Sequence, residues 1–169
     1  MKREKGFTLI ELLIVVMIVG IIASIAIPNL MTAIERSRQK RTMADMRNLA
    51  TAWEARNVET GRFNAAGAQV PGIAEVVDVN ALDYAISPTY IKTMPREDGW
   101  RHPFELYTSF SWGSSAPAAG YAIISPGRDG RFSTGTVGTS GATTNFDCDI
   151  VYSNGAFLQY PQGLQTTTQ

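Results

Sequence analysis

The N-terminal part of the chain is dominated by one long apolar stretch. No charged residue occurs from Leu12 to Ile27. Counted from Phe7, the apolar run is about 21 residues long and is interrupted only by Glu11. A helix of that length rises about 31 Å, which matches the hydrocarbon core of a bilayer. The pattern therefore predicts a helix that can cross a membrane.

The pattern becomes amphipathic after Pro28. Apolar residues then recur three and four positions apart, and they are Leu30, Ile34, Met43, Met46, Leu49, Ala50 and Trp53. This spacing predicts a helix with one buried face, in which Trp53 is a core residue. We expect one helix from about Phe7 to about Glu59, loosened at Pro28 and ended by Gly61.

Shorter apolar segments, separated by Gly and Pro, follow Phe63. The regular segments that we expect are a short helix around Val79 to Ala85, strands at 104–109 and 121–125, and an apolar segment at 150–152 that packs on the sheet. The stretch 134–144 is rich in Gly and Thr and predicts a surface loop, and the tail 166–169 predicts a frayed end. The order of elements indicates the α+β class, with the second half of a long helix packed on a small antiparallel sheet.

Composition excludes several functions. The chain has 169 residues, with fifteen acids and fifteen bases, so bulk charge gives no indication of a nucleic-acid partner. Cys148 is the only cysteine, which rules out an intrachain disulfide. His102 is the only histidine, so a serine or cysteine nucleophile would lack its usual base, and we expect a packing or surface role for it. We therefore expect no catalytic residues and no enzyme.

Charge is unevenly distributed along the chain. The residues before the apolar run are net basic, so the positive-inside rule places them in the cytoplasm and everything after Pro28 on the other side of the membrane. The segment 35–62 is also basic, whereas the residues after Phe63 include nine acids and five bases. For the basic run 36–41, a solvated helix face or a contact between subunits is favoured over DNA binding.

Residues Lys5 to Leu12 read K-G-F-T-L-I-E-L, directly before the apolar run. This segment resembles the class III signal peptide of type IV pilins and type II secretion pseudopilins. The resemblance implies that a membrane-embedded aspartic peptidase cuts between Gly6 and Phe7 and that Phe7 is then methylated. It also identifies Glu11 as the glutamate of the family's helix and Pro28 as its helix-loosening proline.

A carboxylate within an apolar span needs a partner, because an unpaired charge is costly there. The resemblance implies that Glu11 pairs with the freed amine of Phe7, in the same chain or in a neighbour, and so fixes the axial register of a filament. An ordinary secretory signal peptide, cleaved near Ser24-Ile25-Ala26, and a plain single-span anchor are the competing interpretations. The signal peptide leaves Glu11 unexplained.

The resemblance covers most of the chain and is closest to the major pseudopilin of type II secretion. The segments that carry it are 45–52, 59–63, 98–104 and 121–130. Two departures stand out: Arg101 occupies a position where glycine is usual, and the loop after Gly130 is longer than we expect for the family.

In major pseudopilins that loop binds calcium. The resemblance assigns the carboxylates of Asp129, Asp147 and Asp149 to such a site, since carboxylates suit a hard cation. The alternative is that Asp129-Gly130 is a turn and that Asp147 and Asp149 form a solvated edge. In a strand, Cys148 would point opposite to the two flanking aspartates and could belong to the core.

The expected organisation is a leader at 1–6, a transmembrane and polymerisation helix at 7–28, the amphipathic half of the helix at 29–62 and a globular head at 63–169. The implied function is a filament subunit, most simply a major pseudopilin. A type IV pilin for adhesion, motility or DNA uptake is the alternative, and an anchored binding domain or enzyme that does not polymerise is another. The implied partners are other copies of the chain, a prepilin peptidase, an inner-membrane assembly platform and minor pilins or pseudopilins. The implied location is the bacterial inner membrane, with an extracytoplasmic head, followed by a periplasmic or surface filament.

Overall fold

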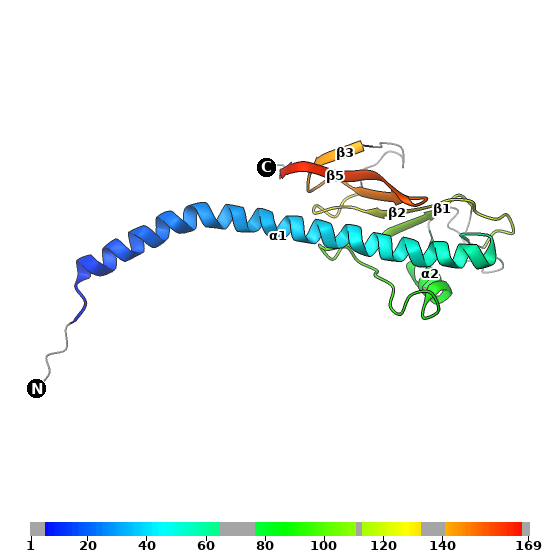
Figure 1. Ribbon diagram of the computed structural model, residues 1–169, viewed down its shortest axis with the longest axis horizontal. Coiled ribbons are helices and arrows are strands. Elements are labelled where there is room, and N and C mark those ends of the chain that lie inside the picture. The colour runs from blue at the N-terminus through cyan, green and yellow to red at the C-terminus, as the bar shows by residue number, and fades with distance from the viewer. Residues whose placement is uncertain (1–5, 65–76, 111–112, 133–140, 167–169) are drawn as a thin grey trace, which may run out of the picture. The chain divides into compact units, whose positions relative to one another are not determined.

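The computed structural model describes residues 6–64, 77–110, 113–132 and 141–166. Its elements are α1 (Leu9–Thr60), α2 (Val79–Ile86), β1 (Glu105–Thr108), β2 (Tyr121–Ser125), β3 (Gly141–Asn145), β4 (Ile150–Ser153) and β5 (Ala156–Thr166) (Figure 1). The chain divides into two compact units, Met1–Arg36 and Ser37–Gln169, and α1 contributes to both. The expected loop at 134–140 and the end of the tail at 167–169 lie outside the described residues.

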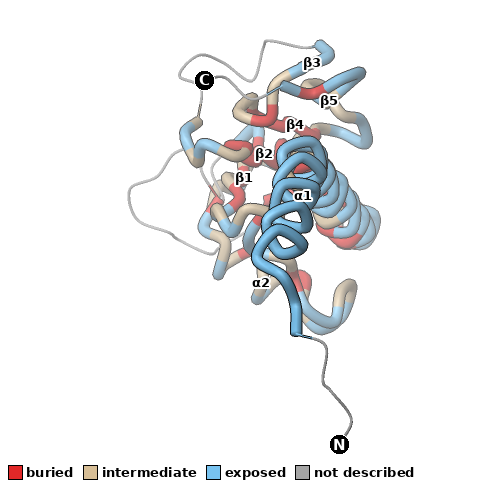
Figure 2. Tube along the Cα trace, turned by 90° about the vertical axis from the view of Figure 1, so that its left-hand side faces the viewer, coloured by how far each residue is buried: buried red, intermediate tan, exposed pale blue. Residues whose placement is uncertain are grey.

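The first unit contains the apolar part of α1. Its large hydrophobic side chains are exposed from Phe7 to Met31. Figure 2 colours this part of α1 as exposed along almost its whole length. Within the described ranges, α1 is the one helix that is long and apolar enough to cross a membrane, and its most apolar window is 0% buried. A continuous apolar surface of this kind has to be covered by lipid or by protein.

In the second unit, α1 has one buried face. Met46, Leu49, Ala50 and Trp53 are fully buried, at the three- and four-residue spacing that the sequence predicts. They pack with residues of the sheet and of α2 in one core cluster. The expected core position of Trp53 is therefore confirmed.

The helix α1 ends where the sequence predicts. Its last residue is Thr60, and Gly61 follows with φ 70°, a conformation that glycine adopts without strain. The Gly61 N–H donates to the Asn57 carbonyl at 2.7 Å, which closes the last turn. The chain then returns to the core at Phe63. The Trp53 indole N–H donates to the Phe63 carbonyl at 2.9 Å and holds it there.

The helix α2 and strands β1, β2 and β4 confirm the short elements expected after Phe63. Asp78 caps α2 by accepting a hydrogen bond from the Asn80 N–H, and Leu82 and Ile86 face the core. On the other side of α2, Asp83 forms an ion pair with Arg96. Ser87 and Arg96 both donate hydrogen bonds to the Asp83 carboxylate, and together they lower its pKa.

The sheet is mixed, which corrects the expected purely antiparallel sheet. Its strand order is β1-β2-β4-β5-β3, with antiparallel pairs except for β3, which runs parallel to β5. Residues 141–144 belong to β3, although they were expected in a loop, and β5 was not expected at all. Both strands lack a regular alternation of apolar residues, and β5 contains Pro161 and Gly163, which are unfavourable within a strand. The two strands are instead held in place by their backbone pairing with each other. The Gln165 side-chain amide adds a hydrogen bond to the Thr143 carbonyl at 2.8 Å.

The turn that precedes β1 lies directly against α1. The Gly99 N–H donates to the Thr42 hydroxyl at 2.8 Å. A Cβ atom at position 99 would lie 2.3 Å from the Arg38 carbonyl oxygen, which is part of the helix backbone. Only glycine permits this approach.

We predict that Gly99→Ala destabilises the head by about 2–3 kcal/mol, because backbone rather than a flexible side chain has to move. Gly120→Ala is the control, since its added Cβ would meet only the side chain of Asn154, at 3.3 Å. Thermal melts of the two detergent-solubilised variants measure the difference. Equal melting temperatures would show that the turn does not need this contact.

Candidate functional site

The segment at the start of α1 holds the residues predicted for processing. Gly6, Phe7 and Thr8 are exposed and lie outside the helix, which begins at Leu9. The peptide bond between Gly6 and Phe7 is therefore in non-helical backbone. A peptidase needs such backbone, because a helix hides its peptide bonds within the hydrogen-bonded backbone.

Glu11 lies in the first turn of α1 and bonds to Thr8. The Thr8 N–H and the Thr8 hydroxyl both donate to Oε2 of Glu11, at 2.9 and 2.6 Å. In return the Glu11 N–H donates to the Thr8 hydroxyl oxygen at 3.3 Å. This reciprocal pattern is a capping box, in which the N-cap residue and the third helical residue satisfy each other's backbone N–H groups.

Pro28 lies within α1, and the helix continues through it. Proline has no N–H, so the Ser24 carbonyl loses its usual donor and the helix is weakened at this turn. Polar side chains cluster here and bond to backbone carbonyls. Asn29 donates to Ile25 at 3.1 Å, and Thr32 donates to Pro28 at 3.0 Å.

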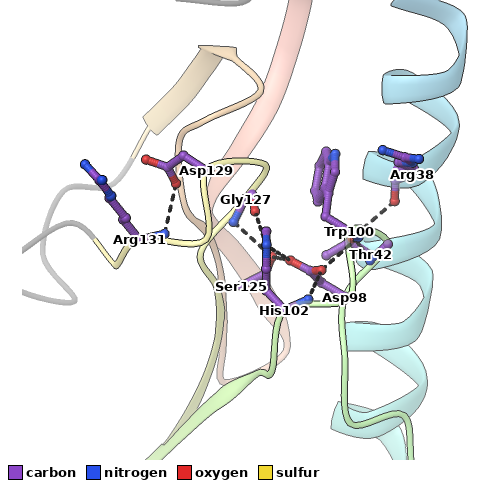
Figure 3. Close-up of polar contacts among 10 residues, drawn as sticks. Arg38, Thr42, Asp98, Trp100, His102, Ser125, Gly127, Asp129 and Arg131 are labelled. Carbon is purple, nitrogen blue, oxygen red and sulfur yellow. Dashed lines mark hydrogen bonds and ion pairs between the residues drawn. The ribbon is translucent and has the colours of Figure 1, made fainter. Parts of the chain in front are cut away.

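In the head, the buried carboxylate of Asp98, a residue that is 3% exposed, accepts several hydrogen bonds (Figure 3). Its Oδ1 atom accepts hydrogen bonds from the Trp100 and His102 N–H groups, at 2.8 and 2.9 Å. Its Oδ2 atom accepts from the Ser125 hydroxyl at the end of β2, at 2.8 Å. One carboxylate thus shapes the 98–102 turn and ties it to the sheet.

His102 extends this network to the loop after β2. Its Nδ1 atom lies 2.9 Å from the Gly127 carbonyl oxygen and 3.8 Å from Oδ2 of Asp98 (Figure 3). A Cβ atom at Gly130 would lie 2.9 Å from Nε2 of the same ring. His102 is therefore a packing residue, as its isolation in the sequence predicts.

Arg101 has φ 70°, in the left-handed region. A residue with a Cβ atom pays about 1–2 kcal/mol for this conformation, whereas glycine does not. The position at which the sequence departs from the resemblance is thus one where the backbone favours glycine.

The three aspartates predicted for calcium occupy different surroundings. Asp147 forms a bidentate ion pair with Arg128, with N···O distances of 2.7 and 3.0 Å. Asp129 is exposed and accepts from the Arg131 N–H at 3.0 Å, whereas Asp149 is 6% exposed. No group of three His, Cys, Asp or Glu side chains able to hold a metal occurs in the part of the chain that the structure describes. Because Arg128 occupies both oxygens of Asp147, a cation would have to displace it to use this carboxylate, and calcium binding stays a prediction.

Cys148 lies in the turn between β3 and β4 and not in a strand, which corrects the expected alternation with its neighbours. Burial raises the pKa of its thiol, and the negative charges of Asp149, Asp147 and Asp129 raise it further. The three carboxylates therefore act on one residue although they form no metal cluster. The thiol is disfavoured as a thiolate at neutral pH.

A long apolar helix, preceded by the segment predicted for processing and followed by an α+β head, defines the class of type IV pilin-like proteins. Residues 1–27 match the family model described as the prokaryotic N-terminal methylation motif. The type II secretion system core protein G of Aeromonas hydrophila is 30% identical over 141 residues, which are 79% of this chain and 89% of that protein. The core protein G of Klebsiella pneumoniae is 27% identical over 149 residues, 87% of this chain and 93% of the relative.

The chain therefore belongs to the type II secretion system core protein G family. The type IV major pilin protein PilA of Myxococcus xanthus is 45% identical, but over only 62 residues, which are 37% of this chain and 28% of that protein. No solved structure matches the chain.

We predict that Asp98→Ala destabilises the head by about 3 kcal/mol, because three donors lose their buried acceptor. Asp129→Ala removes an exposed carboxylate with one local hydrogen bond and should cost less than about 0.5 kcal/mol. Urea unfolding in calcium-free buffer, followed by tryptophan fluorescence, compares the two variants. A loss for Asp98→Ala as small as that for Asp129→Ala would mean that water replaces the carboxylate.

Proposed function

We propose that this chain is the major structural subunit of a type II secretion pseudopilus. In this proposal the leader 1–6 is removed between Gly6 and Phe7, and Phe7 is methylated. The helix 7–28 holds the subunit in the inner membrane before assembly and then packs against other copies in the filament. Residues 29–62 and 63–169 form the amphipathic half of the helix and the extracytoplasmic head.

The observation that carries the proposal is the first unit of the structure. From Phe7 to Met31 the large apolar side chains are exposed, and the only carboxylate in that stretch is Glu11, in the first turn of the helix. A plain membrane anchor requires the apolar surface but not the carboxylate. A subunit that exchanges lipid for neighbouring helices needs the apolar surface, and it needs one polar group to set the register.

The length over which the chain resembles its relatives favours a pseudopilus over a long surface pilus. Similarity to core protein G extends over most of both chains, so it includes much of the head, whereas similarity to PilA is limited to 62 residues. The head is the part that differs between filament types, since function resides in particular sites on a shared fold. A type IV pilin for adhesion, motility or DNA uptake is the second candidate.

The proposal includes partners besides further copies of the chain. Processing requires a prepilin peptidase, and extraction from the membrane requires an inner-membrane assembly platform. Minor pilins or pseudopilins are the further partners in this proposal. The basic residues before Gly6 support a cytoplasmic leader and an extracytoplasmic head.

We predict that the protein purified from its native membrane begins at methylated Phe7. We also expect Glu11→Ala to be cleaved normally but to form no filaments, because the register-setting charge is lost. Intact-mass measurement and electron microscopy of sheared filaments test both points. A chain that starts at Met1 or Ile27, together with an unmodified protein that forms no filaments, would favour an anchored or secreted domain that does not polymerise. Filaments of normal yield from Glu11→Ala would mean that this carboxylate does not set the register.

A test of calcium binding distinguishes the pseudopilus subunit from the type IV pilin. We expect saturating calcium to stabilise the full chain by about 1–3 kcal/mol against thermal unfolding, as a ligand that binds only the folded state does. Asp129 and Asp149 would hold the cation, joined by Asp147 if Arg128 moves aside. Asp129→Asn and Asp149→Asn should each remove the effect, and magnesium is the control cation. Indifference of the unmodified protein to calcium would weaken the pseudopilus assignment.

A further inference from the structure

Two exposed basic residues follow the apolar surface of α1. The exposed large apolar side chains continue past Pro28 as far as Ile34, which is 37% exposed. Arg36 is the first base after them, and Lys40 lies one helical turn further on; both residues are exposed. The apolar surface therefore ends in a positively charged one.

Arg36 and Lys40 have no acidic partner within the chain. They are four positions apart in α1, so they share a face of the helix, where like charges at this spacing are unfavourable. No Asp or Glu occurs three or four positions from either residue. Among the described residues neither forms an ion pair, whereas Arg41 pairs with Asp45 at 3.5 Å. An anionic partner outside the chain would relieve this repulsion.

We propose that Arg36 and Lys40 bind the anionic headgroups of phospholipids at the surface of the membrane that holds the apolar part of α1. The partner is a lipid whose phosphate carries a net negative charge, for which phosphatidylglycerol is the probe. The inference rests on the part of the proposed function that places this helix in a membrane, and it does not require a filament.

Helix length places this pair of bases at the level of the headgroups. From Leu9 to Ile34 a helix rises about 38 Å, which exceeds the hydrocarbon core of about 30 Å but not the membrane with its headgroups, about 40–45 Å. Ile34 then lies in the interface. Arg36 follows about 3 Å further along the helix and Lys40 about 9 Å further. Both side chains are long enough to bend back toward phosphate groups while their stems cover apolar surface.

The position of the pair favours lipid over a second copy of the chain. Basic residues are usually rarer on the translocated side of a membrane, so exposed bases next to the span need an explanation there. Headgroups surround the helix at this level before any neighbouring subunit arrives, and each base near an anionic surface strengthens binding about fivefold. A neighbouring copy, with acids on its head, is the competing partner.

The test measures which lipid the full chain retains. The protein is held in detergent with equimolar phosphatidylglycerol and neutral phosphatidylcholine, and native mass spectrometry counts the bound lipids of each kind. Arg36→Gln/Lys40→Gln removes both charges, and Arg36→Lys/Lys40→Arg exchanges the two side chains but keeps the charges. Lys92→Gln is the control, because it removes an exposed base from the head.

We expect the unmodified protein to retain phosphatidylglycerol in preference to phosphatidylcholine. The double glutamine variant should lower this preference at least about fivefold, the scale of one base near an anionic surface. The exchanged variant and Lys92→Gln should keep it, and salt should weaken it by screening. No preference in the unmodified protein, an unchanged preference in the double glutamine variant, or an equal loss in Lys92→Gln would overturn the inference.

Filament yield, measured with the secretion machinery present, distinguishes lipid from a neighbouring subunit as the partner. If the double glutamine variant keeps its lipid preference but forms fewer filaments, the two bases contact another copy and the lipid assignment is rejected. If the unmodified protein prefers phosphatidylglycerol through these bases but forms no filaments, the proposed function fails and this inference stands.

Discussion

The burial of one face of α1 is the interaction on which the head depends. Trp53 is at its centre, where its ring lies 5.0 Å from the Tyr121 ring and 6.3 Å from the Phe63 ring, measured between centroids. These aromatic side chains come from the helix, from the chain that leaves it and from β2. Each strand that packs on this face buries apolar surface that neither the helix nor the sheet could bury alone.

A few polar interactions join the loops of the head to its helix and strands. Asp98 ties the turn before β1 to the end of β2, and Gly99 places the same turn against α1. Arg128 and Asp147 connect the loop after β2 to the turn before β4. The buried Asp98 carboxylate is tolerated because each of its oxygens accepts hydrogen bonds. Apolar contacts are non-directional, so this network adds a defined geometry to the core.

The two parts of α1, one in each compact unit of the chain, differ in how their apolar residues are distributed. In residues 12–27 the helix carries no charged residue, and Glu11 in its first turn and the residues around Pro28 form polar contacts. After Ser37 the buried large apolar side chains lie on one face, whereas Val58 is exposed. A helix that is apolar all around is suited to lipid or to other helices, whereas an amphipathic helix is suited to one domain.

The sequence by itself determined α1 and its end at Thr60, α2, and strands β1, β2 and β4, because periodic apolar residues, capping residues and glycine act over a few positions. It also identified the segment from Gly6 to Glu11, since that motif is contiguous. Tertiary structure alone decided the pairing of β3 with β5, because polar strands are ordered by their partners and not by their own pattern. It also decided the contacts of Asp98 with Ser125 and of Arg128 with Asp147, which join residues far apart in the chain and leave no local signal in the sequence.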